Sequence, residues 1–166
     1  MLQNELAPKQ SNHTIENIYE LLATVPDPEI PVLSILDLGI VRAVHWDDDL
    51  LNITITPTYS GCPAMDAISI DIKLKMIEHG YSKIKITSVL SPVWTTDWMT
   101  EAGKEKLIAY GIAAPKKSYA DDDEMPACPQ CKSINTSLLS QFGSTACKAL
   151  YQCKNCMEPF DYFKCH

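Results

Sequence analysis

Four of the seven cysteines form two C-x-x-C pairs, Cys128–Cys131 and Cys153–Cys156, with 21 residues between them. Each pair can present two thiolates to one ion, and four thiolates arranged as a tetrahedron satisfy Zn²⁺ without an open position. The gap is slightly longer than is usual for such pairs, which a longer hairpin would accommodate. The spacing therefore predicts a structural zinc site, and so small a module would need the metal to fold. A rubredoxin-like iron site with the same ligands is the alternative.

A fifth cysteine, Cys62, lies where a predicted strand gives way to a predicted helix. Residues 52–79 read as strand, tight loop and helix, because apolar and polar residues alternate up to Pro57, which cannot donate to a sheet. Pro63 suits the first helical position, so Cys62 should lie at or beside the helix cap. Free backbone N–H groups and the helix dipole at that place favour a thiolate. The alternative is a small apolar residue that fills space near a helix start.

Two carboxylates, Asp27 and Glu29, lie in a segment with three prolines among six residues, 26–31. The prolines end the preceding helix and fix an extended loop. A stiff loop of this kind can hold carboxylates toward a site, and it can equally be a plain turn. Both interpretations stay open from the sequence.

Three further residues have side chains of metal-binding type, namely Cys147, Cys165 and His166. A single cysteine is more often buried than ligating. Together with Cys62, however, they are chemically suited to a labile iron or cluster site shared between the two parts of the chain. They are kept as candidate additional ligands.

The elements that must position these residues follow from periodicity. The sequence predicts a small α/β unit, a two-layer α+β sandwich with a mixed sheet and about three helices, followed by a small all-β zinc ribbon. Helices are expected over 15–25, with Thr14 as cap, over 63–79 and over 98–110. Strands are expected over 40–46, 50–56, 83–89, 136–142, 146–152 and 159–163, with 50–56 antiparallel to 40–46 and a parallel partner for 83–89.

Composition divides the chain into four parts. Residues 1–13 are expected to be a flexible tail, 14–112 the first domain, 113–126 an acidic linker and 127–166 the ribbon module. Of the aromatic residues, Trp98 is expected to plug the first core and Trp94 to make external contacts. The ribbon core is expected to contain the following aromatic residues: Phe142, Tyr151, Phe160, Tyr162 and Phe163.

Charge and hydropathy exclude several classes of protein. The formal net charge is −7 and the pI is near 5.0, which argues against nucleic-acid binding. No apolar run is long enough to span a membrane and no secretory signal is visible, so a cytoplasmic protein is expected. In that compartment C-x-x-C pairs indicate metal or redox chemistry, not disulfides. The four histidines show no arrangement that would activate Cys62, so no enzyme is expected.

Three motifs together resemble a known family domain. Asp27–Pro31, Asp37–Val41 and Gly61–Pro63 occur in the order found in the iron–sulfur assembly domain of the SufT type. The resemblance covers roughly residues 14–112, and Trp94–Met99 fits the last loop and helix of that domain. One departure is Tyr59-Ser60, where many members have Ala-Pro, and it is not expected to move the thiol.

The C-terminal part resembles the PaaD (PaaJ) family through Phe142–Lys148 and the ending Phe160–His166. Members of that family are accessory subunits encoded with the multicomponent phenylacetyl-CoA epoxidase. The resemblance implies delivery of iron or an iron–sulfur cluster to subunits of that complex, above all the reductase with its plant-type [2Fe–2S] centre. It also implies that Cys62 is the transfer thiolate and that Asp27 and Glu29 line its site.

These observations support a maturation factor, with the ribbon as a docking module whose net charge of +2 selects an acidic client. Two alternatives stay open, an electron carrier with iron at the four paired cysteines and a scaffold that only bridges oxygenase subunits. The sequence leaves the oligomeric state open, including a homodimer.

Overall fold

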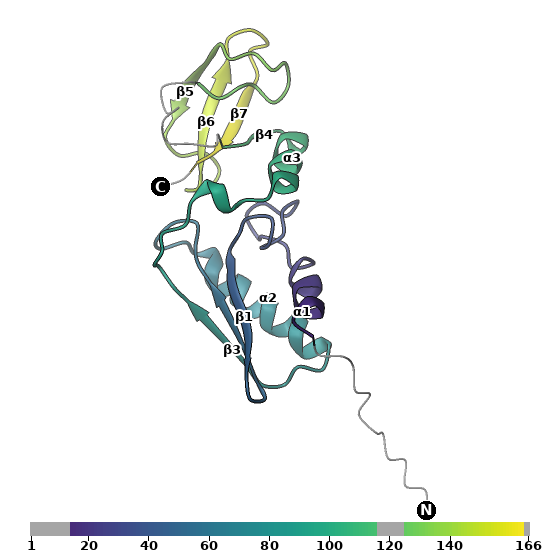
Figure 1. Ribbon diagram of the computed structural model, residues 1–166. Coiled ribbons are helices and arrows are strands. Elements are labelled where there is room, and N and C mark those ends of the chain that lie inside the picture. The colour runs from purple at the N-terminus through teal and green to yellow at the C-terminus, as the bar shows by residue number, and fades with distance from the viewer. Residues whose placement is uncertain (1–13, 116–124, 165–166) are drawn as a thin grey trace, which may run out of the picture.

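The structure, a computed structural model, describes residues 14–115 and 125–164, which form two sheets at opposite ends of the molecule (Figure 1). The first sheet has the order β1-β2-β3, with β1 at Val41–Asp47, β2 at Leu50–Ile55 and β3 at Ile84–Ser88. β1 is antiparallel to β2, and β3 is parallel to β2. The predicted hairpin and the predicted parallel partner are both confirmed.

Three α-helices accompany this sheet: α1 (Ile15–Leu22), α2 (Ala64–Glu78) and α3 (Glu101–Tyr110). The Thr14 hydroxyl accepts a hydrogen bond from the Asn17 backbone N–H, as expected of a helix cap. The third helix begins later than predicted. A 3₁₀ turn, η1 (Thr96–Trp98), comes first, and Thr100 then caps α3 through Gly103 N–H at 2.9 Å.

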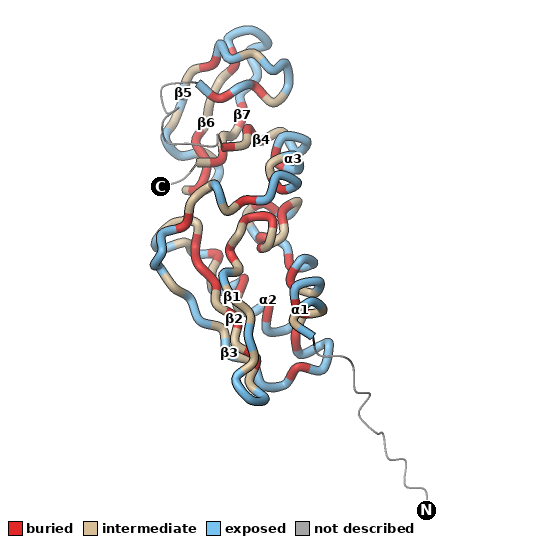
Figure 2. Tube along the Cα trace, viewed as in Figure 1, coloured by how far each residue is buried: buried red, intermediate tan, exposed pale blue. Residues whose placement is uncertain are grey.

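The first core lies between the sheet and α2, with α1 packed beside α2 (Figures 1 and 2). It includes the inward-facing residues of β2 and one face of α2: Leu51, Ile53, Ile55, Ile68, Ile72 and Met76. The alternation along β2, buried at every second residue, is what the sequence pattern predicts.

The second sheet has the order β4-β7-β6-β5. Its strands are β4 (Ile112–Ala113), β5 (Thr136–Ser140), β6 (Lys148–Cys153) and β7 (Pro159–Phe163). The three predicted ribbon strands are present. Strand β4 was not predicted from the sequence. It pairs parallel with β7 and so brings the chain just after α3 into the same sheet as the ribbon strands.

A tryptophan and a phenylalanine join the two sheets. The Trp94 and Phe163 rings meet edge-on, with their ring centroids 6.0 Å apart, and both residues are 1% exposed. The Trp94 indole N–H donates to the Leu38 carbonyl oxygen at 2.8 Å. The expectation that Trp94 makes external contacts is therefore wrong. Trp98 is only half-buried, with the Arg42 guanidinium 3.4 Å from its ring centroid.

The aromatic core predicted for the ribbon is wrong in two members. Phe142 is 61% exposed, with the Lys164 ammonium over its ring, and Phe163 belongs to the first core. Phe160 is buried in the second core, and Tyr151 and Tyr162 pack partly buried against it. Phe163 is misassigned because the sequence does not reveal that the ribbon packs against the first core.

Candidate metal and transfer sites

The four paired cysteines converge at one end of the second sheet. The sulfur atoms of Cys128, Cys131, Cys153 and Cys156 all lie within 4.8 Å of one another. Cys131 and Cys153 are 3.5 Å apart at sulfur, and Cys128 and Cys156 are 3.7 Å apart. A tetrahedron with Zn–S bonds of 2.3 Å has edges of about 3.8 Å. The four side chains therefore fit one tetrahedral ion.

Backbone conformation explains how each pair turns its sulfurs inward. Lys132 follows the first pair and Met157 follows the second, and both have left-handed backbone dihedrals (φ 63° and 65°). The Lys132 N–H donates to the Cys128 carbonyl at 2.9 Å, which closes the first turn. The Asn155 N–H donates to the Cys153 sulfur at 3.4 Å, a contact that favours a thiolate.

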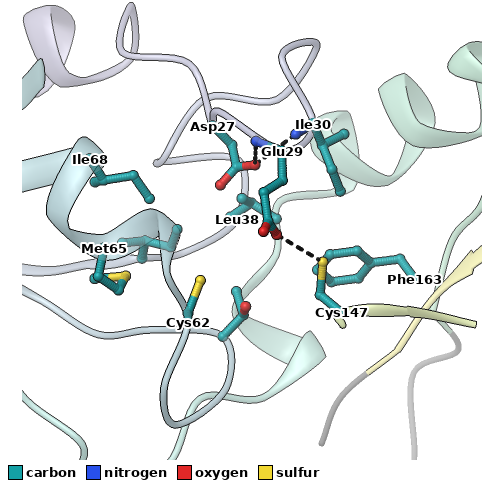
Figure 3. A pocket seen from close by; sticks show the side chains of 11 residues that line it. Asp27, Glu29, Ile30, Leu38, Cys62, Met65, Ile68, Cys147 and Phe163 are labelled. Atoms are coloured by element: carbon teal, nitrogen blue, oxygen red, sulfur yellow. Dashed lines mark hydrogen bonds between the residues drawn. The ribbon is translucent and has the colours of Figure 1, made fainter. Parts of the chain in front are cut away.

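A second set of metal-binding side chains lines a small pocket between the two sheets (Figure 3). We call it the interface pocket, and its volume is about 10 Å³. Its polar side is formed by Asp27, Glu29, Thr58, Cys62 and Cys147. Its apolar side is formed by Ile30, Leu38, Ile40, Met65, Ile68 and Phe163. The residues expected to take part in transfer, Cys62, Asp27 and Glu29, are thus brought together.

Asp27 both makes a turn and lines the pocket. Its Oδ1 accepts the backbone N–H groups of Glu29 at 2.9 Å and Ile30 at 2.7 Å. Burial raises the pKa of Asp27 and outweighs these two donors, which lower it. The turn interpretation is confirmed, and the same side chain also faces the pocket, where its role in a site stays a prediction.

Cys62 lies beside the helix cap as predicted, because Pro63 is the cap and α2 begins at Ala64. The prediction of a favoured thiolate is nevertheless wrong for the metal-free protein. Burial raises the pKa of the Cys62 thiol, and the negative charges of Glu29 and Asp27 raise it further. The Ala64 N–H, which donates to the sulfur, does not compensate. The helix end is present, but the surroundings decide the charge.

Tyr59, at the position that departs from the family pattern, also contacts this thiol. Its hydroxyl hydrogen-bonds the Cys62 sulfur, and this contact by itself lowers the cysteine pKa. Burial together with Cys62 and Glu29 raises the pKa of Tyr59 to about 12. The phenol is therefore a hydrogen-bond donor to Cys62 at neutral pH.

Cys147 comes into the pocket from the second sheet. It is 3% exposed, and its S–H donates to Glu29 Oε2 at 3.4 Å. The Thr145 hydroxyl lies 3.0 Å from the same sulfur. Burial and the Glu29 carboxylate raise the pKa of Cys147 to about 12, so the thiol is protonated in the metal-free protein. The other two candidate ligands, Cys165 and His166, lie outside the described residues.

Comparison with known proteins agrees with this two-part construction. Residues 15–78 match the family model of an iron–sulfur cluster assembly protein, and residues 113–164 match the PaaD zinc beta ribbon domain. Over 162 residues the chain is 48% identical to an Escherichia coli protein that is named as one subunit of a "Putative 1,2-phenylacetyl-CoA epoxidase", with 96% of each chain covered. The chain belongs to the PaaD family. The predicted fold class and family resemblance are both confirmed.

Shorter relatives match only the first part of this PaaD family member. A protein from Porphyromonas gingivalis named "Fe-S protein maturation auxiliary factor" is 39% identical, over 53% of this chain and 85% of its own. YitW of Bacillus subtilis, with the same description, is 38% identical over 58% of this chain and 93% of its own. A Bacillus anthracis domain of unknown function, DUF59, superposes with a TM-score of 0.52 at 30% identity over 55% of this chain and 89% of that chain.

These matches support an accessory role, since the relatives' names describe a complex subunit and maturation factors. Among the described residues, none of the helices has the length and apolar character needed to cross a membrane.

Proposed function

We propose that this protein is a maturation factor that delivers iron or an iron–sulfur cluster to the multicomponent phenylacetyl-CoA epoxidase in the cytoplasm. Its client is the reductase subunit with the [2Fe–2S] centre. Residues 14–112 form the assembly domain and residues 127–166 a zinc-stabilised docking module. In this proposal the protein acts as an accessory factor of the oxygenase complex and not as an enzyme.

The observation that carries the proposal is the meeting of one accessible thiol and two carboxylates in the interface pocket. Cys62 is half-exposed, whereas Glu29 and Asp27 form the facing wall (Figure 3). A delivery site must take up its cargo and release it again, which a complete set of four strong ligands would resist. A single thiol beside carboxylates at the surface suits such exchange. The names of the shorter relatives point to the same role.

The four paired cysteines supply a rigid second sheet in this proposal. Zinc held by four thiolates has no open position, so its role is structural. Of the lysines in this part of the chain, Lys132 and Lys154 are exposed beside the cysteine pairs, whereas Lys148 is buried and paired with Asp161 at 3.7 Å. The surface offered to an acidic client is therefore the one around the metal.

The test is the Cys62→Ala variant, co-expressed with the reductase in a host that lacks its own copy of this factor. We expect the [2Fe–2S] content of the purified reductase to fall at least severalfold, measured by its visible absorption and by labile sulfide. The control is Ser60→Ala, an exposed change in the same loop, which should leave the cluster content at the wild-type level.

Full cluster occupancy with Cys62→Ala would refute the proposal. If occupancy stayed full while deletion of residues 127–166 prevented assembly of the complex, the protein would be a scaffold. A red, redox-active preparation with iron in place of zinc would indicate the electron carrier.

A further inference from the structure

We propose that the open edge of β5 binds an extended segment of the client by strand addition, and that this segment is apolar at its centre and acidic at its ends. The inference rests on the proposed function, because it names the surface of the docking module that meets the client. The backbone of β5 and the leucine side chains along it form that surface.

β5 is an edge strand without charged residues. In the order β4-β7-β6-β5 it pairs only with β6, so its other side is open among the described residues (Figure 1). No Asp, Glu, Lys or Arg occurs between Lys132 and Lys148. The edge strands of the first sheet, by contrast, carry charges, such as Arg42 on β1 and Lys85 on β3. Because charges normally protect an exposed edge from pairing, the uncharged edge of β5 indicates a surface that a partner covers.

The open side of β5 offers backbone groups as well as apolar side chains. The Asn135 carbonyl accepts the Lys154 N–H at 2.8 Å and so faces β6. Backbone groups point to alternate sides along a strand, so the N–H and C=O of Leu138 face the open side. The register shift of β5 comes after this residue, between Leu138 and Ser140. A partner strand can therefore hydrogen-bond to Leu138 without displacing β6.

A row of apolar side chains crosses the second sheet and ends at this edge. Tyr151 lies opposite Phe160 where β6 pairs with β7, and opposite Leu138 where β5 pairs with β6. The rings of Tyr151 and Phe160 are stacked with their centroids 6.0 Å apart. The exposed fraction rises from 5% at Phe160 to 40% at Leu138. Since cross-strand neighbours stabilise a sheet, an added strand with an apolar residue beside Leu138 would extend the row and cover it.

Lysines flank both ends of this uncharged edge. Lys132 and Lys154 are exposed near its start. Beyond its end, the Lys164 ammonium lies 4.6 Å from the centroid of the Phe142 ring. Acidic residues at the ends of a bound segment would complement these cations, whereas a second copy would bring the same lysines against one another. The charges therefore favour a different chain over a homodimer.

The test measures the affinity of the full-length, zinc-loaded protein for the purified reductase subunit. We expect Leu138→Lys to weaken binding at least tenfold, because it places a charge in the apolar row. Leu138→Pro should have the same effect, since proline removes an N–H that faces away from β6. The matched control is Leu74→Lys, the same change at an exposed leucine of α2, which should leave the affinity unchanged. Retention of one zinc per chain shows that a variant is folded, and each of the two Leu138 variants tests the inference without the other.

Hydrogen exchange distinguishes strand addition from other kinds of docking. We expect the Leu138 amide to exchange at least tenfold more slowly in the complex with the reductase than in the free protein. Raised salt should weaken the complex, because it screens the flanking lysines. Normal affinity in the folded Leu138 variants, or unchanged exchange of the Leu138 amide in the saturated complex, would overturn the inference. A dimer of this protein that Leu138→Lys converts to monomers would also overturn it, because the edge would then bind a second copy.

Failure of the proposed function gives a different pattern. If Leu138→Lys no longer binds the reductase but Cys62→Ala leaves the reductase cluster complete, the docking surface stands and the delivery role falls. If Cys62→Ala empties the reductase and Leu138→Lys binds it normally, delivery stands and the docking surface falls.

Discussion

At the scale of single residues, the environment of a side chain decides its chemistry more than its local position does. Cys62 has the helix start that lowers a thiol pKa, yet burial and two carboxylates raise it. Asp37 shows the opposite balance. Burial raises its pKa, but hydrogen bonds from Lys106 and Ser34 outweigh burial and hold the pKa below its usual value. The family motif around Asp37 thus has a structural explanation.

We expect Asp37→Asn to lower the free energy of unfolding by about 1–3 kcal/mol at pH 7. Asp37 Oδ2 accepts from the Ser34 N–H at 2.9 Å and from the Lys106 ammonium at 2.6 Å, and Oδ1 accepts from the Thr100 hydroxyl at 3.1 Å. Since Lys106 is half-exposed, most of the loss comes from the partly buried hydrogen bonds with Ser34 and Thr100.

The pH dependence follows from the lowered pKa. Ionised Asp37 stabilises the fold at pH values above the pKa that this carboxyl has in the unfolded chain. The contribution is lost as the pH falls through the lower pKa that it has in the folded protein. Urea unfolding at pH 7 and at successive values below about 4 should therefore show the gap between wild type and Asp37→Asn closing. The exposed control Asp71→Asn should stay within about 0.5 kcal/mol of wild type. A gap that is independent of pH would contradict this assignment.

At the scale of elements, turns decide where helices and strands begin and how closely they approach. Gly39, with φ of 66°, precedes β1, and a Cβ there would overlap the Trp98 carbonyl of η1. The same turn holds the Leu38 carbonyl toward the Trp94 indole. A glycine that looks like an ordinary turn residue therefore lets two segments distant in the sequence pack together.

We expect Gly39→Ala to destabilise the protein by more than the left-handed backbone alone explains. Gly80 is the matched control, since its φ is 89° and a Cβ there meets nothing within 4 Å. Gly80→Ala should cost about 1–2 kcal/mol from the backbone alone. Gly39→Ala should cost about 1–3 kcal/mol more, because the overlap must be relieved by movement of η1. Thermal and urea unfolding measure both, and equal losses would show that the close approach does not matter.

At the scale of the whole molecule, one aromatic contact joins two units that carry different metal-binding residues. The first unit supplies Cys62 and Glu29, and the second supplies Cys147. Phe163 belongs by chain position to the second sheet but is buried in the first core. The docking of the two units and the composition of the interface pocket therefore depend on the same side chain.

We expect Phe163→Ala to cost about 3–5 kcal/mol of stability, the usual loss for a buried phenylalanine. It should leave the zinc content at one per chain, because the four paired cysteines lie elsewhere in the second sheet. Phe142→Ala is the matched control, since Phe142 is 61% exposed, and it should change neither quantity appreciably. Loss of zinc from Phe163→Ala would mean that the second sheet itself had unfolded.

Local pattern was sufficient for the features that depend on short stretches of chain. Alternation predicted β2 and its partners, Thr14 marked the start of a helix, and the two C-x-x-C pairs identified the four thiols that the structure brings within 4.8 Å. These features depend on residue spacing and on the backbone preferences of individual residues, and both can be read from the sequence alone.

Only the tertiary structure decided how the two units meet. Cys147 and Glu29 are separated by 118 positions, and no local pattern connects them. Their contact follows from the docking of the second sheet on the first unit, and the edge-on contact with Phe163 helps to bury Trp94. The raised pKa of Cys62 follows from burial and from the nearby Glu29 and Asp27. Burial and electrostatics depend on which surfaces pack together, so the sequence names the ligands and the fold determines their protonation and their neighbours.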